Sequence, residues 1–159
     1  MPRAKLEEGK DVPDHCHVAR YCAHYRVRSA GSGTRPIIKR TAFHRGRRDT
    51  ADISLSVMEW FDSCNDEEVI YQVCKHRGNL NVENGGYYVV LNVAIMKRTV
   101  SDSTGCQHRL VFTKSPGNPA HATFFTQNLM VSTALAALTN SENQSRLYPV
   151  PDPIPDRAP

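Results

Sequence analysis

Two histidines and an arginine, His24, His121 and Arg26, are the side chains of this sequence best suited to acid–base chemistry on a phosphate. Imidazole titrates near neutral pH, so one histidine can take a proton from a hydroxyl while the other protonates a leaving oxygen. A guanidinium stabilises the negative charge that develops between them. His121 follows a loop that contains glycine. If that loop meets the segment with His24 and Arg26, the three residues predict metal-independent cleavage of a phosphodiester.

A second cluster of chemically capable side chains consists of His15, Cys16, His17, Cys22 and His24. Imidazole and thiolate are ligands that zinc accepts, but the spacing is not the usual pair of nearby cysteines. In a continuous strand, His15 and His17 would point away from Cys22 and His24, because side chains alternate between the two faces. We therefore predict no metal and no cofactor, although a bulge in the strand would reopen the question. The five cysteines, odd in number and irregularly spaced, are predicted to be reduced thiols.

Positive charge is concentrated in residues 15–48, which contain nine basic residues and no acidic one, whereas the rest of the chain holds 11 basic and 16 acidic residues. Arginine, which supplies eight of the nine, grips phosphate or carboxylate with two parallel hydrogen bonds. The stretch predicts a nucleic-acid-facing protein that binds RNA or DNA through Arg20, Arg26, Arg28, Arg45, Arg47 and Arg48. The alternative is a protein-interaction module or inhibitor that docks its basic face on an acidic protein partner. A solvated surface paired with the acids of the fold itself is the third interpretation.

Arg20 and Arg26 belong to the segment Arg20–Arg28, in which apolar and polar residues alternate as is typical of a strand. One face would be core-like and the other cationic. The core-like face would carry Tyr21, Ala23, Tyr25 and Val27, and the cationic face Arg20, Cys22, His24, Arg26 and Arg28.

Apolar periodicity and turn residues predict the other elements. Ser56 and Glu59 have the spacing of a capping box, and Asn65 or Asp66 is suited to begin a further helix. The expected elements are a strand over 36–43, a short helix from 56, a helix over 67–76, strands over 87–96 and 105–113, and a helix over 125–140. The fold class is therefore α+β, with a mostly antiparallel sheet of four to five strands and two to three packed helices.

Length and composition predict one domain. The chain has 159 residues, of which 40% are hydrophobic and 23% charged, as in ordinary globular proteins. We expect a flexible lead-in over 1–14, a single α+β domain over 15–147 and a Pro-rich extended tail over 148–159. No apolar run is long enough for a membrane span and no secretory signal is recognisable, so a cytoplasmic location without membrane contact is expected. Neither a dinucleotide-binding nor an NTP-binding glycine motif occurs.

Four short stretches carry a family resemblance: Val-Ala-Arg-Tyr at 18–21, Leu-Ser-Val-Met-Glu-Trp-Phe at 55–61, Val-Leu-Asn-Val at 90–93 and Asn-Pro-Ala-His-Ala at 118–122. With these the chain resembles short uncharacterised bacterial proteins that have Leu-Ser-Val-x-Trp and Asn-Pro-x-His-Ala stretches. The resemblance covers residues 15–150 and implies a bacterial or phage cytoplasmic origin. It carries over no activity and no catalytic residue.

Overall fold

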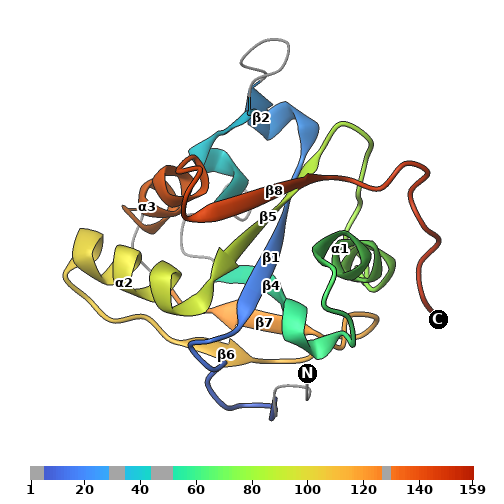
Figure 1. The fold of residues 1–159 in the computed structure, drawn as a ribbon. Helices are drawn as coiled ribbons and strands as arrows, with labels where there is room; N and C mark the ends of the chain where they lie inside the picture. The colour runs from blue at the N-terminus through green and yellow to red at the C-terminus, as the bar shows by residue number, and fades with distance from the viewer. Residues whose placement is uncertain (1–5, 29–34, 44–51, 127–129) are drawn as a thin grey trace.

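The fold is described from a computed structural model for residues 6–28, 35–43, 52–126 and 130–159. Among these residues, six strands form one antiparallel sheet in the order β6-β7-β4-β1-β5-β8 (Figure 1). They are β1 (His17–Cys22), β4 (Ile53–Val57), β5 (Tyr87–Asn92), β6 (Leu110–Phe112), β7 (His121–Phe124) and β8 (Ser145–Pro149). The α+β class is confirmed. The expected count of four to five strands was wrong, partly because β8 includes residues assigned to the tail.

Helices cover both faces of the sheet (Figure 1). Helix α1 (Asp66–Lys75) packs on one face, and helices α2 (Val93–Thr104) and α3 (Met130–Thr139) pack on the other. Because strand side chains alternate, β1 places Val18 in the core beneath α2 and α3 and Ala19 in the core beneath α1. The sheet is thus the central layer of three.

Helix α1 forms as its sequence predicts, whereas α2 does not. Asn65 Oδ1 accepts the backbone N–H groups of Glu67 and Glu68, which begins α1 within one residue of the expected start. The strand expected over 87–96 ends at Asn92, whose side chain accepts the N–H of Ile95 and begins α2. An apolar run of this length is compatible with either element, so the local pattern could not separate them.

The strand predicted over Arg20–Arg28 stops at Cys22. Its partner β5 begins at Tyr87, directly opposite Cys22, so no neighbour remains to continue the ladder. The chain then turns through a 3-10 helix, η1 (His24–Arg26), into β2 (Val27–Arg28), which pairs only with β3 (Ile37–Ile38). The predicted faces were therefore wrong: Tyr25 is 61% exposed, and Cys22 is fully buried.

The capping box predicted at Ser56 was also wrong, because residues 53–57 form β4. The apolar residues Ile53, Leu55 and Val57 alternate with two serines, which is a strand period that overrides the local capping motif. Two short 3-10 helices, η2 (Arg40–Phe43) and η3 (Met58–Trp60), complete the described elements.

Both ends of the described chain lie against the domain. Within the predicted lead-in, residues 9–12 run beside β6, where Gly9 and Val12 donate backbone hydrogen bonds to Phe112 and Leu110, and Val12 is buried. The tail, from residue 150, passes α1 in extended form (Figure 1) and its Ala158 N–H donates to the Lys75 carbonyl. No helix in the described ranges combines the length and apolar character of a membrane span.

Candidate functional site

The α1-facing side of β4 and β7 is polar, and it lines a cavity. Register places Ala19 of β1, Ser56 of β4 and His121 of β7 side by side across the sheet. The cavity, here called the inner cavity, has a volume of about 420 Å³ and lies beside the end of α1. Its polar lining consists of Arg20, Tyr21, Ser54, Ser56, Arg77, Asn79, Tyr88, Ser115, Asn118 and His121, and none of the described lining residues is Asp or Glu.

Two arginines that line the inner cavity, Arg20 and Arg77, have guanidiniums that are held by backbone carbonyls. Arg20 Nε donates to Ala42 O at 2.8 Å, and its Nη1 donates to Ser54 O at 2.9 Å. Arg77 Nη1 donates to Cys74 O at 2.9 Å and to Pro155 O at 2.8 Å. Within the described ranges, no carboxylate pairs with Arg77. Its positive charge is thus held in place without being neutralised, which favours an anionic ligand.

A hydrogen-bonded network of two threonine hydroxyls holds the ring of His121. Its Nδ1 lies 2.8 Å from Thr113 Oγ1, which in turn lies 2.8 Å from Thr123 Oγ1. Asn118 Nδ2 donates to Ser56 Oγ at 3.2 Å, while the buried Asn118 Oδ1 has no partner among the described residues. The network fixes the ring beside two potential ligand-binding groups, a serine hydroxyl and an amide.

A second buried polar atom of a lining residue, Arg77 Nε, likewise has no hydrogen bond from the described residues, as is the case for Asn118 Oδ1. An unpaired buried donor or acceptor costs about 1–3 kcal/mol. A polar ligand that reached these atoms would recover part of that free energy.

The tyrosines of the inner cavity are neutral donors rather than bases at physiological pH. Burial raises the pKa of Tyr88 far above its ordinary value, and the neighbouring Cys74 thiol adds to the effect. Burial is also the main cause of the raised pKa of Tyr21, although the Glu83 N–H that donates to its hydroxyl at 3.1 Å acts in the opposite direction. His121 is the histidine of the described lining, and its imidazole is the side chain there that is suited by type to acid–base chemistry.

Two glycines close one wall of the inner cavity. Gly78 and Gly117 have φ of +60° and +75°, and a Cβ built on Gly117 would lie 3.0 Å from the Gly78 Cα. Only glycine combines this backbone conformation with so close an approach of two loops. The contact places the residues after α1 against the loop before β7.

A second, smaller hollow of about 310 Å³ adjoins the inner cavity and shares Arg20, Tyr21 and Leu80 with it. We call it the outer hollow. It is lined by Tyr25 and Arg26, whose guanidinium carbon lies 5.2 Å from the centre of the Tyr25 ring. Arg26 also donates to the Thr41 carbonyl. Glu83 also lines the outer hollow. The inner cavity and the outer hollow together form a groove whose described lining has three arginines and one carboxylate and which ends at an exposed aromatic ring.

The chain matches no family model, no curated protein and no solved structure. The groove is therefore interpreted from its own chemistry. It offers fixed cations, hydroxyl and amide donors and an exposed ring, which are the groups that bind a phosphate and stack on a base.

The structure separates the residues that the sequence predicted would act together. Arg20 and His121 both line the inner cavity, and Arg26 lines the outer hollow. His24 lines neither. Its side chain is 51% exposed, and its Nδ1 lies 3.5 Å from the Glu83 carboxylate.

The remaining predicted anion-binding residues lie outside the groove or outside the description. Arg28 is exposed on β2 and lines neither hollow. Arg45, Arg47 and Arg48 lie outside the described residues. Sequence reasoning missed Arg77 and Tyr25. For Tyr25 the misleading signal was the alternation of Arg20–Arg28, while the approach of Arg77 to β4 is long-range and left no local pattern.

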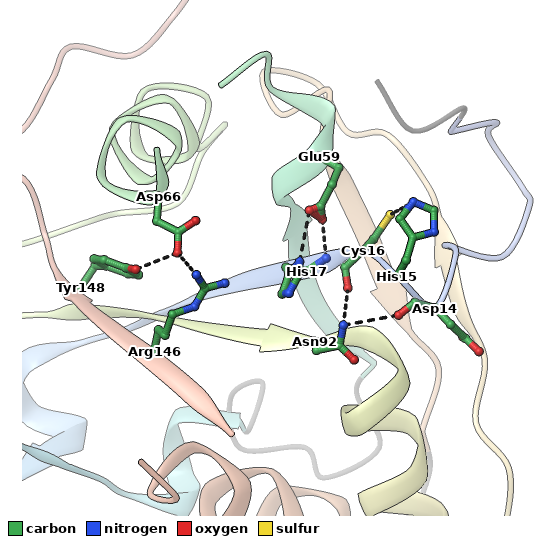
Figure 2. Close-up of polar contacts among 9 residues, drawn as sticks. All are labelled: Asp14, His15, Cys16, His17, Glu59, Asp66, Asn92, Arg146 and Tyr148. Carbon is green, nitrogen blue, oxygen red and sulfur yellow. Dashed lines mark hydrogen bonds and ion pairs between the residues drawn. The ribbon is translucent and has the colours of Figure 1, made fainter. Parts of the chain in front are cut away.

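The His/Cys cluster is dispersed rather than gathered. Cys22 is buried and its thiol donates to Arg20 O at 3.8 Å, whereas His17 lies on the opposite face of β1 beside Glu59 (Figure 2). Cys16 Sγ lies 3.9 Å from His15 Nε2. In the described part of the chain, no three His, Cys, Asp or Glu side chains converge where they could hold a metal ion.

Proposed function

We propose that the protein binds single-stranded nucleic acid, with a backbone phosphate in the inner cavity and a base against Tyr25. The observation that carries this proposal is a cavity whose described lining contains no acidic residue, in which backbone carbonyls hold the Arg77 guanidinium, and which continues into a hollow with an exposed tyrosine. Proteins that bind single strands combine a cationic groove for the backbone with aromatic rings for the bases. The groove of this protein has both parts next to each other.

Shape also favours a single strand over a duplex. Arg77 is only partly exposed and lines a concave site beside the end of α1. A duplex presents its phosphates on a stiff cylinder, whereas a single strand can bend a phosphate into a cavity and turn a base outward.

Binding is proposed here without the two-histidine cleavage mechanism. That mechanism needs His24 and His121 on either side of one phosphate, and His24 lies outside both hollows beside Glu83. With the tyrosines protonated, His121 has no second acid–base group of suitable pKa among the residues that line the inner cavity.

The proposal is tested by fluorescence anisotropy with labelled oligo-dT and oligo-U at increasing salt. We expect affinity to fall steeply with salt, because each neutralised phosphate of a single strand contributes about −0.7 to the slope of log K against log salt. Arg26→Ala should weaken binding and make the slope shallower. Arg98→Ala is the matched control, because Arg98 is an exposed arginine of α2, on the opposite side of the sheet (Figure 1).

Two results would overturn the proposal: no binding at low salt, or equal loss of affinity in the Arg26→Ala and Arg98→Ala proteins. The latter would mean that net charge, not the groove, determines binding. Should oligonucleotides fail to bind while one acidic protein co-purifies in equal amount, and is lost on Arg26→Glu and Arg28→Glu, the basic face would instead be a protein-docking surface.

A further inference from the structure

The carboxylate of Glu83 is the one group of the groove that phosphate binding does not account for. Glu83 is the acidic residue in the described lining of the outer hollow, and the described lining of the inner cavity has none. A carboxylate repels a phosphate, so a groove that held a strand by its backbone alone would bind more tightly without it. The Glu83 side chain is 54% exposed, and among the described residues no lysine or arginine forms an ion pair with it. Its oxygens are therefore accessible acceptors.

Contacts of the loop before β5 hold Glu83 at the outer hollow. The Glu83 N–H donates to Tyr21 Oη at 3.1 Å, and Tyr21 lines both the inner cavity and the outer hollow. A Cβ built on Gly86 would lie 2.7 Å from Tyr21 Cε2, so the same loop passes directly against that ring. Glu83 Oε2 lies 3.5 Å from His24 Nδ1. The carboxylate is thus placed by the fold, on the side of the groove where the exposed tyrosine lies.

An acceptor and a donor flank the Tyr25 ring in the outer hollow. The His24 ring, which contacts Glu83, lies at the edge of the Tyr25 ring with 5.5 Å between their centres. The Arg26 guanidinium carbon lies 5.2 Å from the centre of the Tyr25 ring. Leu80, which is 45% exposed, adds apolar surface to the same hollow. The outer hollow therefore combines a stacking ring, a carboxylate with two acceptor oxygens and a guanidinium with several N–H donors.

These polar groups match the hydrogen-bonding edges of guanine better than those of the other bases. Guanine has two adjacent donors, N1–H and N2–H, and two acceptors, O6 and N7. A carboxylate accepts two parallel hydrogen bonds from adjacent donors, and an arginine donates to O6 and N7. Adenine and cytosine have an amino group next to an acceptor nitrogen, and thymine and uracil have one N–H between two carbonyls. Each of these would turn an acceptor toward the carboxylate.

We propose that the outer hollow selects an unpaired guanine, which stacks on Tyr25, donates N1–H and N2–H to Glu83 and accepts from Arg26. This inference rests on the proposed function, because the adjoining inner cavity would hold a phosphate of the same strand. The ligand class is thus a single strand of DNA or RNA that contains guanine, rather than any single strand. The guanine must be unpaired, since in a duplex its N1–H and N2–H donate to cytosine. Single-stranded bases are read in this way, by stacking and by hydrogen bonds to their Watson–Crick edge.

The first test varies one base and leaves the protein unchanged. Labelled oligo-dT is displaced by unlabelled pentamers of thymidine whose central base is guanine, hypoxanthine, adenine, cytosine or thymine. We expect the guanine pentamer to displace the label at about tenfold lower concentration than the all-thymine pentamer, as is typical of one bidentate contact. Hypoxanthine keeps N1–H, O6 and N7 but lacks the 2-amino group, so it should lose most of this preference. Free 5′-GMP should displace the label far more weakly than the guanine pentamer; equal displacement would mean that the ligand is a guanine nucleotide and would overturn the strand.

The second test removes the carboxylate. Glu83→Gln replaces one acceptor oxygen by an N–H₂ donor and removes a negative charge from the groove. The guanine preference should therefore fall from about tenfold to about onefold, while the affinity for the all-thymine pentamer should rise. Glu142→Gln is the matched control, because it removes the same charge at an exposed residue that follows α3, and it should keep the preference. A charge effect without a base contact would change the affinities of both pentamers by the same factor.

Three results would overturn the inference: equal displacement by the guanine and thymine pentamers, preference for another base, or a guanine preference that survives Glu83→Gln in folded protein. Failure of the guanine site is distinguishable from failure of the groove. If strands bind with the expected salt dependence and lose affinity in Arg26→Ala but not in Arg98→Ala, yet show no base preference, the groove stands and the guanine site does not. If no strand binds at low salt, both are wrong.

Discussion

Replacing Tyr25 by alanine separates the function of the groove from the stability of the fold. Tyr25 is 61% exposed, and the described contacts of its ring are an edge contact with the His24 ring at 5.5 Å and the Arg26 guanidinium at 5.2 Å. An exposed cation–π pair contributes about 0.5–1 kcal/mol, so the free energy of unfolding should fall by no more than about 1 kcal/mol. Stacking of one base on an aromatic side chain is worth about 1–3 kcal/mol. The variant should therefore bind a single strand roughly 5- to 150-fold more weakly at nearly unchanged stability.

The assay compares anisotropy titrations of wild type, Tyr25→Ala and Tyr25→Phe with oligo-dT and with the same oligonucleotide carrying abasic sites. Tyr25→Phe retains a stacking ring and should bind as the wild type does. The abasic strand should bind the wild type and Tyr25→Ala with equal affinity, because it has no base that could stack on the Tyr25 ring. If Tyr25→Ala loses the same affinity for the abasic strand, or loses none for oligo-dT, then no base lies on this ring and the placement of the strand is wrong.

Two further predictions concern the fold that supports the groove. Gly117→Ala should lower the free energy of unfolding by about 1–3 kcal/mol in chemical denaturation, because it combines a strained positive φ with a contact against Gly78. Gly105→Ala is the control, because residue 105 also has a positive φ but an added Cβ there has no neighbour within 4 Å. An equal loss of stability in both variants would show that the loops of Gly78 and Gly117 do not meet closely. Alkaline pH should destabilise the protein through its buried thiols, since burial raises the pKa of both Cys16 and Cys22 from 9.0 to about 12. The two protonated thiols contribute fully to the free energy of unfolding below pH 9, and this contribution is lost as the pH rises toward 12, because the unfolded chain releases these protons first. The free energy of unfolding then falls by up to about 1.4 kcal/mol per pH unit for each thiol. Urea midpoints from pH 8 to 10.5 should fall less steeply in Cys22→Ala than in wild type, and parallel curves would contradict the assignment.

Local signals in the sequence predicted the elements whose boundaries are determined locally. Helix α1 has a capping side chain, acids in its first turn and an apolar stripe at helical spacing, all within about ten residues. The Ser56–Glu59 motif shows the limit of this reasoning, because Ser56 is bonded to Asn118 and Glu59 to His17. Both partners are remote in sequence, and a capping motif carries no information about them.

Residues of the candidate site could be predicted from the sequence only where the residue type itself indicates a chemical role. Arg20 and His121 were chosen for charge and titration, and the sheet register that brings β1, β4 and β7 together places both in one cavity. Arg77 carries the same positive charge as Arg20, but no local motif surrounds it at the end of a helix. Its place in the inner cavity follows only from the packing of two loops through Gly78 and Gly117. The prediction for His24 depended on a strand that continues past Cys22, and the start of β5 at Tyr87 ends that strand.

The segment from residue 155 to 158 determines when the groove can be complete during synthesis. Pro155 O holds the Arg77 guanidinium, and Arg157 donates to the carbonyls of Gly78 and Leu80, both of which line the inner cavity. A ribosome makes residues 77–80 long before it makes their anchors. Until then, of the two carbonyls that hold the Arg77 guanidinium, only that of Cys74 is present. Extensions fused near residue 158 would be expected to disturb ligand binding before they disturb the central sheet.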